Sequence, residues 1–233
     1  MLLGQVLWLV LALAGPLGFR ASLLGWRPAL MLVAVGLGGL VLTGFISLVA
    51  LFWLLRSGRP GGPAICLPAA GIGLVALIGL LLVGLRGAQA PPIHDITTDP
   101  GNPPLFAAAA QLRGEGDNLI AYPGEAVAGV QRKAYPDLVP IEVALAPAEA
   151  FARCLGVAER LGWTIVGQNR DQGMIEAIDR TLVFGFTDDI AIRIVASGDG
   201  SRIDLRSASR AGVGDFGTNA KRICSFAAAF RNP

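Results

Sequence analysis

The chain has 233 residues, of which 53% are hydrophobic and only 15% are charged, and its formal net charge is +2. Soluble globular domains average about 25% charged residues, so this composition excludes a single soluble domain and indicates a membrane segment. Residues 1–90 contain five arginines and no acidic residue, which leaves 14 bases and all 17 acids in residues 91–233. Neither half carries the basic stripe that binding of nucleic acid requires, so nucleic acid is excluded as a partner.

Three uncharged apolar runs occupy the first part of the chain, at about residues 2–19, 29–55 and 64–85. A helix needs about 20 apolar residues to cross the core of a bilayer. The first run contains Gln5 and Pro16 and has the alternative of being a signal peptide. No basic residue precedes it and its cleavage site is poor, so we expect a retained span. Residues 1–86 are therefore predicted to form a three-helix membrane anchor.

The predicted spans contain no Asp, Glu, Lys, Arg or His. Transport of ions or protons requires polar groups at depth, so the pattern favours an anchor over a transporter. The second and third spans are rich in glycine, which is common in membrane helices and lets helix backbones approach closely. We expect a compact bundle, with a seam for another membrane protein as a further possibility.

The orientation of the anchor is encoded by few charges. Arg20, Arg27 and Arg86 would flank the side of the soluble domain, and Arg56 and Arg59 the opposite side. The positive-inside rule therefore favours a cytoplasmic soluble domain by a margin of one residue.

Residues 87–140 are rich in Pro and Gly and contain the only histidine, His94. Proline favours extended or turn backbone, and two YP dipeptides add turn signals. This stretch is predicted to be a linker and wrapping segment. A short helical turn is expected at residues 105–112, and residues 118–139 are expected to be irregular.

Residues 141–233 are predicted to form the core of an α+β domain. Apolar periodicity predicts a helix at 147–161, four strands at 163–168, 174–184, 188–197 and 201–209, and a closing helix capped by Thr218. An antiparallel four-stranded sheet with both helices on one face follows. The turn at residues 198–200 places Ile194 opposite Ile203 and Arg193 opposite Asp204.

The sheet face away from the helices is predicted to carry alternating acidic and basic side chains. These form either a solvated face of cross-strand ion pairs or a site, because the run RSASR concentrates hydrogen-bond donors next to a polar loop. Arg206 and Arg210 are expected to cluster with Asp188 and Asp189. The predicted polar cluster comprises Asp188, Asp189, Arg193, Asp204, Arg206, Ser207, Ser209, Arg210, Asp215 and Asn219, with His94, Asp95 and Asp99 as secondary candidates.

The chemistry of these residues leaves few options open. One histidine and no CxxC motif disfavour zinc, although Asp188 and Asp189 with Asp95 or Asp99 would suit a hard cation. A hydrolase using Ser207 or Ser209 with His94 is conceivable, but no GxSxG motif supports it, and both serines are expected to face the core. No metal and no cofactor are predicted.

Cys154 and Cys224 fall on the two predicted core helices. They are predicted to be two buried thiols, although an oxidising compartment would permit a disulfide between them.

Four stretches carry a family resemblance: IHDITTDPGNPPLF (93–106), LGWTIV (161–166), IEAIDRTLVFGFTDDIAIRI (175–194) and RIDLRSASRAGVGDFGTNAKRI (202–223). Over residues 91–231 the chain resembles the domain-of-unknown-function family 1499. The resemblance implies no established activity. It implies an envelope or plastid-membrane protein, which favours a periplasmic soluble domain on a bacterial inner membrane.

Two functions of different classes follow from the sequence. The first is a membrane-anchored, non-catalytic interaction or accessory protein, whose partners are the lipid bilayer and another membrane or envelope protein. The second is a hydrolase or a small-anion or cation-binding protein that uses the polar cluster.

Overall fold

The computed structural model describes residues 1–58 and 62–232, which divide into two compact units. One comprises residues 1–88 with 182–185, and the other comprises the rest of the chain from residue 89 onwards. Arg59, one of the arginines that the orientation depends on, lies outside the described residues.

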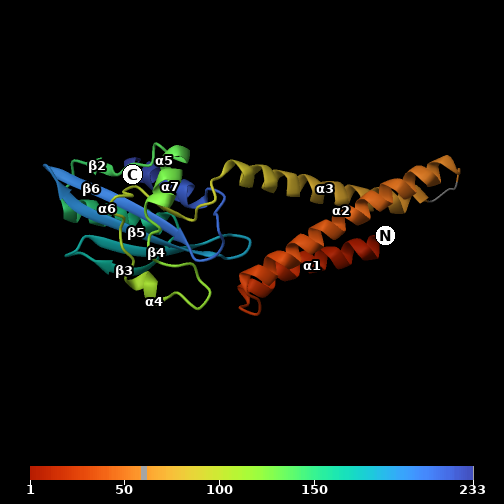
Figure 1. Cartoon of the computed structure of the whole chain (residues 1–233), viewed down its shortest axis with the longest axis horizontal. Helices are drawn as coiled ribbons and strands as arrows, with labels where there is room; N and C mark the ends of the chain where they lie inside the picture. The colour runs from red at the N-terminus through yellow and green to blue at the C-terminus, as the bar shows by residue number, and fades with distance from the viewer. Residues whose placement is uncertain (59–61, 233) are drawn as a thin grey trace. The chain divides into compact units, whose positions relative to one another are not determined.

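The first unit consists of three helices, α1 (Leu2–Arg20), α2 (Trp26–Arg56) and α3 (Gly62–Gln89) (Figure 1). All three are long and apolar enough to cross a membrane, as the uncharged runs predict. The helices pack closely. A Cβ atom added to Gly44 on α2 would lie 2.6 Å from the Cα of Gly73 on α3. The Gln5 side chain on α1 donates to the Ala69 carbonyl of α3 at 2.8 Å.

The second unit contains a six-stranded antiparallel sheet in the order β1-β6-β5-β4-β3, with β2 also paired to β6. The four predicted strands correspond to β3–β6, so the predicted number was two too small. The two missed strands have three residues each, which is too short to produce an alternating pattern. The strand bounds are β1 Asp95–Thr97, β2 Ile141–Val143, β3 Thr164–Asn169, β4 Met174–Arg180, β5 Thr187–Ser197 and β6 Gly200–Ser209.

The register of the β5–β6 hairpin agrees with the prediction. Ile194 pairs with Ile203 and Arg193 with Asp204. A two-residue turn closes the hairpin, and its first residue, Gly198, has a φ of 54°, which glycine adopts without strain. The register therefore places the charges of β5 and β6, apart from Asp188, on one face of the sheet and their isoleucines on the other.

Helices α6 (Pro147–Arg160) and α7 (Thr218–Arg231) cover the apolar face of the sheet. Their inner side chains form the core with β4, β5 and β6, and the rings of Trp163 and Phe226 stack with centroids 5.5 Å apart. The fully buried centre of this core includes Val157, Ile175, Ile190, Ile192, Ile203, Leu205, Ile223, Phe226 and Phe230.

The opposite face of the sheet is covered by the segment from residue 98 to residue 139. This segment contains α4 (Ala108–Gln111) and α5 (Glu125–Ala134), the second of which lies where irregular structure was expected. Gln131 attaches α5 to the sheet because its amide group exchanges two hydrogen bonds with the backbone of Thr97, at 3.0 and 2.6 Å. The polar face is therefore buried, and its interpretation as a solvated surface is wrong.

Two further expectations are corrected around α7. Its N-cap residue is Gly217, and the Asp215 carboxylate, in place of Thr218, accepts from the backbone N–H groups of Gly217 and Asn219 at 2.8 Å each. Cys154 is a buried free thiol, but Cys224 is exposed, so only one of the two cysteines is in the core.

Candidate functional site

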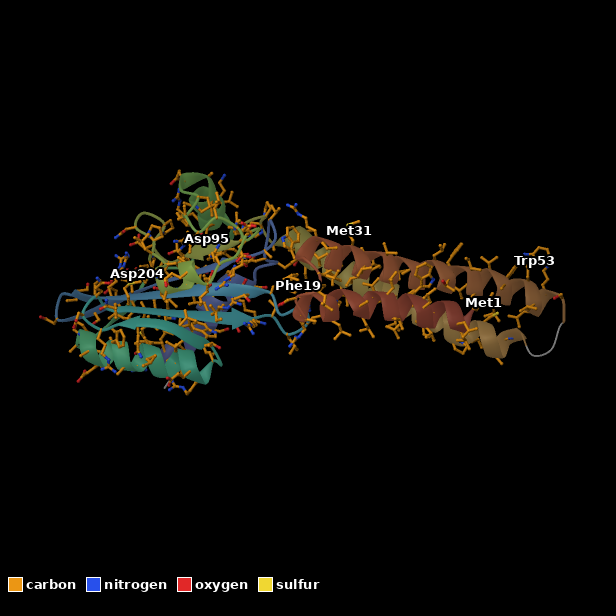
Figure 2. All side chains as sticks on the ribbon, turned by 90° about the horizontal axis from the view of Figure 1, so that it is seen from below. Met1, Phe19, Met31, Trp53, Asp95 and Asp204 are labelled. Carbon is orange, nitrogen blue, oxygen red and sulfur yellow. The ribbon has the colours of Figure 1, made fainter. Side chains whose placement is uncertain are left out.

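The polar face of the sheet carries charges from four neighbouring strands. Figure 2 shows Asp95 and Asp204 on the side of the sheet opposite α6. β1, β6, β5 and β4 contribute these side chains because every second residue of a strand points to the same face. The members on this face include Asp95 from β1, Asp189 and Arg193 from β5, Arg202, Asp204 and Arg206 from β6, and Glu176 from β4.

Arg206 is bound bidentately to Asp95. Its Nε atom donates to Oδ1 at 3.0 Å, and its Nη2 atom donates to Oδ2 at 2.7 Å. The exposed fractions of the two side chains are only 1% and 2%. A planar guanidinium fits a carboxylate in this geometry, so the two buried charges neutralise each other.

The wrapping segment completes the environment of Arg206. Its remaining donors reach the carbonyl oxygens of Pro104 and Ile120, and its guanidinium carbon lies 4.6 Å from the ring centre of Phe106 and 5.4 Å from that of Tyr122. Burial and the nearby Asp95 carboxylate raise the pKa of Tyr122 to about 12. Arg206 thus holds the wrapping segment to the sheet.

Asp189 binds two arginines. Arg210 donates to both of its carboxylate oxygens, and Arg113 from the wrapping segment donates to Oδ2 at 2.8 Å. The two guanidinium groups also donate to the carbonyl oxygens of Leu112 and Asn118. Asp189 is fully buried, and its two cations fasten the loop around residues 112–118 to the end of the sheet.

The charges nearest to solvent form a four-membered ring. Asp204 accepts from Arg193 at 2.8 Å and from Arg202 at 3.0 Å, and Asp99 accepts from the same two arginines at 3.2 and 2.9 Å. Hydrogen bonding to Asp204 raises the pKa of Arg202. Because two carboxylates and two guanidinium groups satisfy one another, this ring presents little net charge.

Glu176 on β4 binds the start of α4. Its carboxylate accepts the backbone N–H groups of Ala107, Ala108 and Ala109 at 2.9–3.0 Å. These N–H groups have no partner within the helix, so the buried carboxylate supplies one. Glu176 therefore has a structural role, because it binds the start of α4 to β4.

The other face of the sheet contains a second polar group beneath α7. Arg222 lies 2.7 Å from Asp188 and donates through Nε to Asp179 at 3.0 Å. Its Nη1 atom donates to the Ser207 hydroxyl and the Asn219 carbonyl oxygen. Burial raises the pKa of Asp188, an effect that the Arg222 charge opposes. Asp188 and Asp189 therefore lie on opposite faces. Of the cluster expected from Asp188, Asp189, Arg206 and Arg210, only the pair of Asp189 with Arg210 forms, because Arg206 binds Asp95 and Asp188 binds Arg222.

Asn219 connects α7 to the first residues of the domain. Its amide nitrogen donates to the His94 carbonyl oxygen at 3.0 Å and to the Ser209 hydroxyl at 2.9 Å. The His94 ring contacts the Val213 carbonyl oxygen at 3.2 Å. Ser207 is fully buried and donates to the Asn219 oxygen, so a substrate reaching this hydroxyl would have to displace α7.

The predicted polar residues are thus divided into four groups. One surrounds Arg206, a second Asp189, a third is the ring with Asp204, and the fourth lies beneath α7. Arg113, Arg202 and Arg222 complete these groups, and Glu176 lies outside them. None of these four residues was predicted from the sequence. Only Arg202 had a usable signal, because it alternates with Asp204 along the last strand. Within residues 1–58 and 62–232, no three metal-ligating side chains come together.

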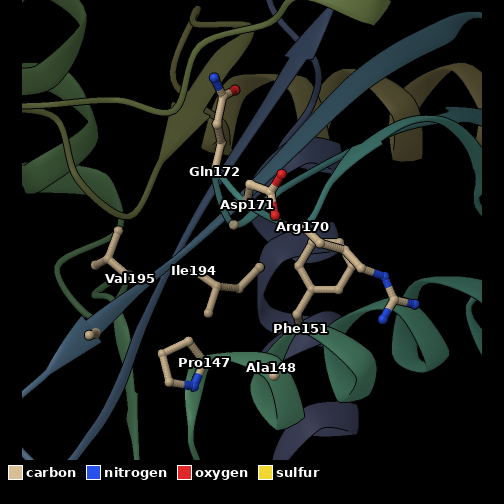
Figure 3. A pocket seen from close by; sticks show the side chains of 10 residues that line it. Pro147, Ala148, Phe151, Arg170, Asp171, Gln172, Ile194 and Val195 are labelled. Atoms are coloured by element: carbon tan, nitrogen blue, oxygen red, sulfur yellow. The ribbon is translucent and has the colours of Figure 1, made fainter.

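An open groove of about 460 Å³ lies at the end of the sheet where β5 and β6 turn (Figure 3). Pro147 and Phe151 of α6 form one wall, Ile194 of β5 forms the floor, and the turn at residues 170–173 forms the other wall. The guanidinium carbon of Arg170 lies 5.5 Å from the ring centre of Phe151. The groove is therefore mainly apolar and has charged groups at one rim.

Comparison with protein families gave one match. The family described as "Protein of unknown function (DUF1499)" matches residues 95–230, which include all six strands and both core helices. A comparison with curated proteins gave no match.

Proposed function

The chain belongs to the DUF1499 family of proteins of unknown function, and from this starting point we propose that it is a membrane-anchored, non-catalytic interaction or accessory protein. The three apolar helices would hold it in a bilayer. The α+β domain would dock another membrane or envelope protein, and the whole would serve as a subunit of a larger membrane complex.

The groove between α6 and the end of β5 is the observation that carries this proposal. β4 begins at Met174, which pairs with Arg193, so residues 195–197 of β5 run past the start of β4 on that side. An extended peptide adds to such a strand edge through backbone hydrogen bonds and places alternate side chains in neighbouring pockets. The apolar floor at Ile194 would accept an apolar side chain, and Arg170 at the rim would accept an acidic one.

The buried carboxylates are bound to guanidinium groups or to backbone N–H groups, and this favours the interaction function over the catalytic alternative. Asp95, Asp189 and Asp204 each bind one or two guanidinium groups, and Glu176 binds three backbone N–H groups. A general base or an ion-binding carboxylate must have a free lone pair facing its substrate or ion. These carboxylates instead hold the domain together, as expected for a rigid scaffold.

The proposed location is a bacterial inner membrane, with the α+β domain on the periplasmic side. The family resemblance supports this side. The arginine count gives only a one-residue margin for the other side, so labelling of the domain from outside the cell decides between them.

Photochemical crosslinking from the groove tests the docking proposal. A benzoylphenylalanine placed at Gln172, on the groove wall, should give a discrete protein adduct in native membranes. The same group at Ser225, which is exposed on α7, serves as the control. Adding Ala148→Asp, on the α6 wall, and Arg170→Glu to the Gln172 probe should abolish the adduct without changing the melting temperature, because both side chains are exposed.

Two outcomes of the crosslinking experiment would contradict the docking proposal. An equal set of adducts from Ser225 would mean that the groove has no special role. An adduct that survives both groove substitutions would mean that the partner binds elsewhere.

A further inference from the structure

Exposed apolar side chains between residues 90 and 232 are concentrated in loops at one end of the sheet. Among the described residues from 90 to 232, ten large apolar side chains are exposed. Six of them belong to loops at the same end of the sheet: Leu112, Leu119, Leu182, Val183, Val213 and Phe216. The exposed fraction reaches 91% for Leu182 and 74% for Val213.

The strand register shows that these loops share one end. Arg180, the last residue of β4, pairs with Thr187, the first of β5, and Asp188 pairs with Ser209, the last of β6. The β4–β5 loop and the loop after β6 therefore leave the sheet side by side. Asn118 joins them, since its side chain donates to the Ser209 and Gly212 carbonyl oxygens, which places Leu119 at the same end.

The opposite end of the sheet has a different composition. Its turns read SGDGS at residues 197–201 and NRDQG at residues 169–173. Polar turns are the ordinary way to end strands in water. The contrast within one sheet indicates that the two ends meet different surroundings.

Phe216 adds a conformational observation. It has a φ of 54°, a region that bulky residues rarely adopt, and its side chain is 63% exposed. The backbone thus holds an aromatic ring outward at a conformational cost, and such strain is characteristic of functional positions.

The connection between α3 and β1 shows which end of the sheet is joined to the predicted membrane helices. Only residues 90–94 join α3 to β1, and an extended chain spans at most about 3.5 Å per residue, so Asp95 lies within about 20 Å of the end of α3. Asp95 pairs with Ala208 near the end of β6. The loop after β6 also touches this connection: a Cβ atom on Gly214 would lie 3.3 Å from Pro92. The apolar end is therefore the end attached to the proposed anchor.

We infer that Leu119, Leu182, Val183, Val213 and Phe216 form a lipid-contacting patch that lies in the interfacial layer of the bilayer. The inference rests on the membrane anchoring in the proposed function but not on the docking groove. Apolar side chains enter the headgroup and upper acyl region to a depth of about 5–10 Å, which single loops can reach.

Fluorescence quenching in vesicles tests the patch. The full chain carries Cys66→Ala and Cys224→Ser, retains the buried Cys154, and receives one new cysteine for the fluorophore NBD. Leu182→Cys and Phe216→Cys report on the patch, and Val195→Cys, which is also exposed but lies next to the β5–β6 turn at the polar end, is the matched control. The vesicles contain phosphatidylcholine and phosphatidylglycerol with a nitroxide near the headgroup.

The nitroxide lipid should quench the labels at 182 and 216 several-fold more than the label at 195, and aqueous iodide should show the reverse order. Labels at 182 and 216 that remain as open to iodide as the label at 195 overturn the inference and leave the anchor standing. Labels protected from both quenchers overturn it in favour of a protein contact. A chain that does not remain with the vesicles after flotation overturns the anchor as well.

Discussion

The Arg206 side chain, the largest one that is fully buried in the described chain, depends on Asp95 for its neutralisation. We predict that Arg206→Ala lowers the free energy of unfolding by about 3–5 kcal/mol, because it leaves the Asp95 carboxylate buried without its partner. Denaturant unfolding of the full chain in detergent, followed by circular dichroism, measures the change.

Arg160→Ala serves as the control for this substitution. Arg160 is exposed at the end of α6, and exposed substitutions usually change stability by less than about 0.5 kcal/mol. Arg206→Lys should fall between wild type and Arg206→Ala, since lysine keeps the charge but loses the bidentate geometry. Equal stability of Arg206→Ala and Arg160→Ala would contradict the role assigned to the buried pair.

The two cysteines of the α+β domain should differ in reactivity. Burial raises the pKa of Cys154 to about 12, and the thiolate is the nucleophilic form, so raising the pH from 7 to 9 should leave Cys154 unmodified in the folded protein. N-ethylmaleimide should modify the exposed Cys224 over the same range, and both after unfolding. Mass spectrometry of the peptides checks this, and modification of Cys154 before unfolding would contradict it.

Helix α7 provides a prediction at the scale of one element. The Asp215 carboxylate accepts two backbone N–H groups at the start of this helix, so Asp215→Ala should destabilise the domain by about 1 kcal/mol, as loss of a helix cap does. Thr218→Ala should have little effect. Thermal melting of both variants compares them, and a larger loss from Thr218→Ala would restore the sequence-based assignment of the cap.

The elements that the sequence predicts best are those whose pattern is long and local. β5 and β6 alternate over ten or eleven residues, so their register followed from pairing isoleucine with isoleucine. β1 and β2 contain three residues each, and α5 carries a polar sequence, EAVAGVQRKA, whose ends lack strong signals. These three elements form because they pair with a completed sheet, which local sequence does not reveal.

The contacts of the candidate site likewise divide into those that a local pattern predicts and those that depend on tertiary packing. The neighbours of Arg206 along β6 are given by alternation, but its partner, Asp95, lies 111 residues away. Arg222 lies within the predicted closing helix, but its contact with Asp188 depends on how α7 crosses the sheet. Periodicity predicts which face a charge occupies, whereas the pairing of charges depends on tertiary packing.

At the scale of the whole molecule, one natural residue, Cys224, can report on which side of the membrane the α+β domain lies. If the α+β domain is periplasmic, a membrane-impermeant maleimide should label Cys224 in intact cells, because that cysteine is exposed. The variant Cys224→Ser gives the background. Labelling that requires lysis of the cells would place the domain in the cytoplasm and favour the arginine count.

The long separation between β1 and β6 has a consequence for how the domain is made. β1 leaves the ribosome soon after α3, but its partner strand, β6, is among the last elements to be synthesised. Pairings between distant segments slow folding, so the wrapping segment must wait, unpaired, until almost the whole chain has emerged. Premature release or a stalled ribosome would then leave this segment open to proteases and chaperones, and quality control of the protein should act mainly during this interval.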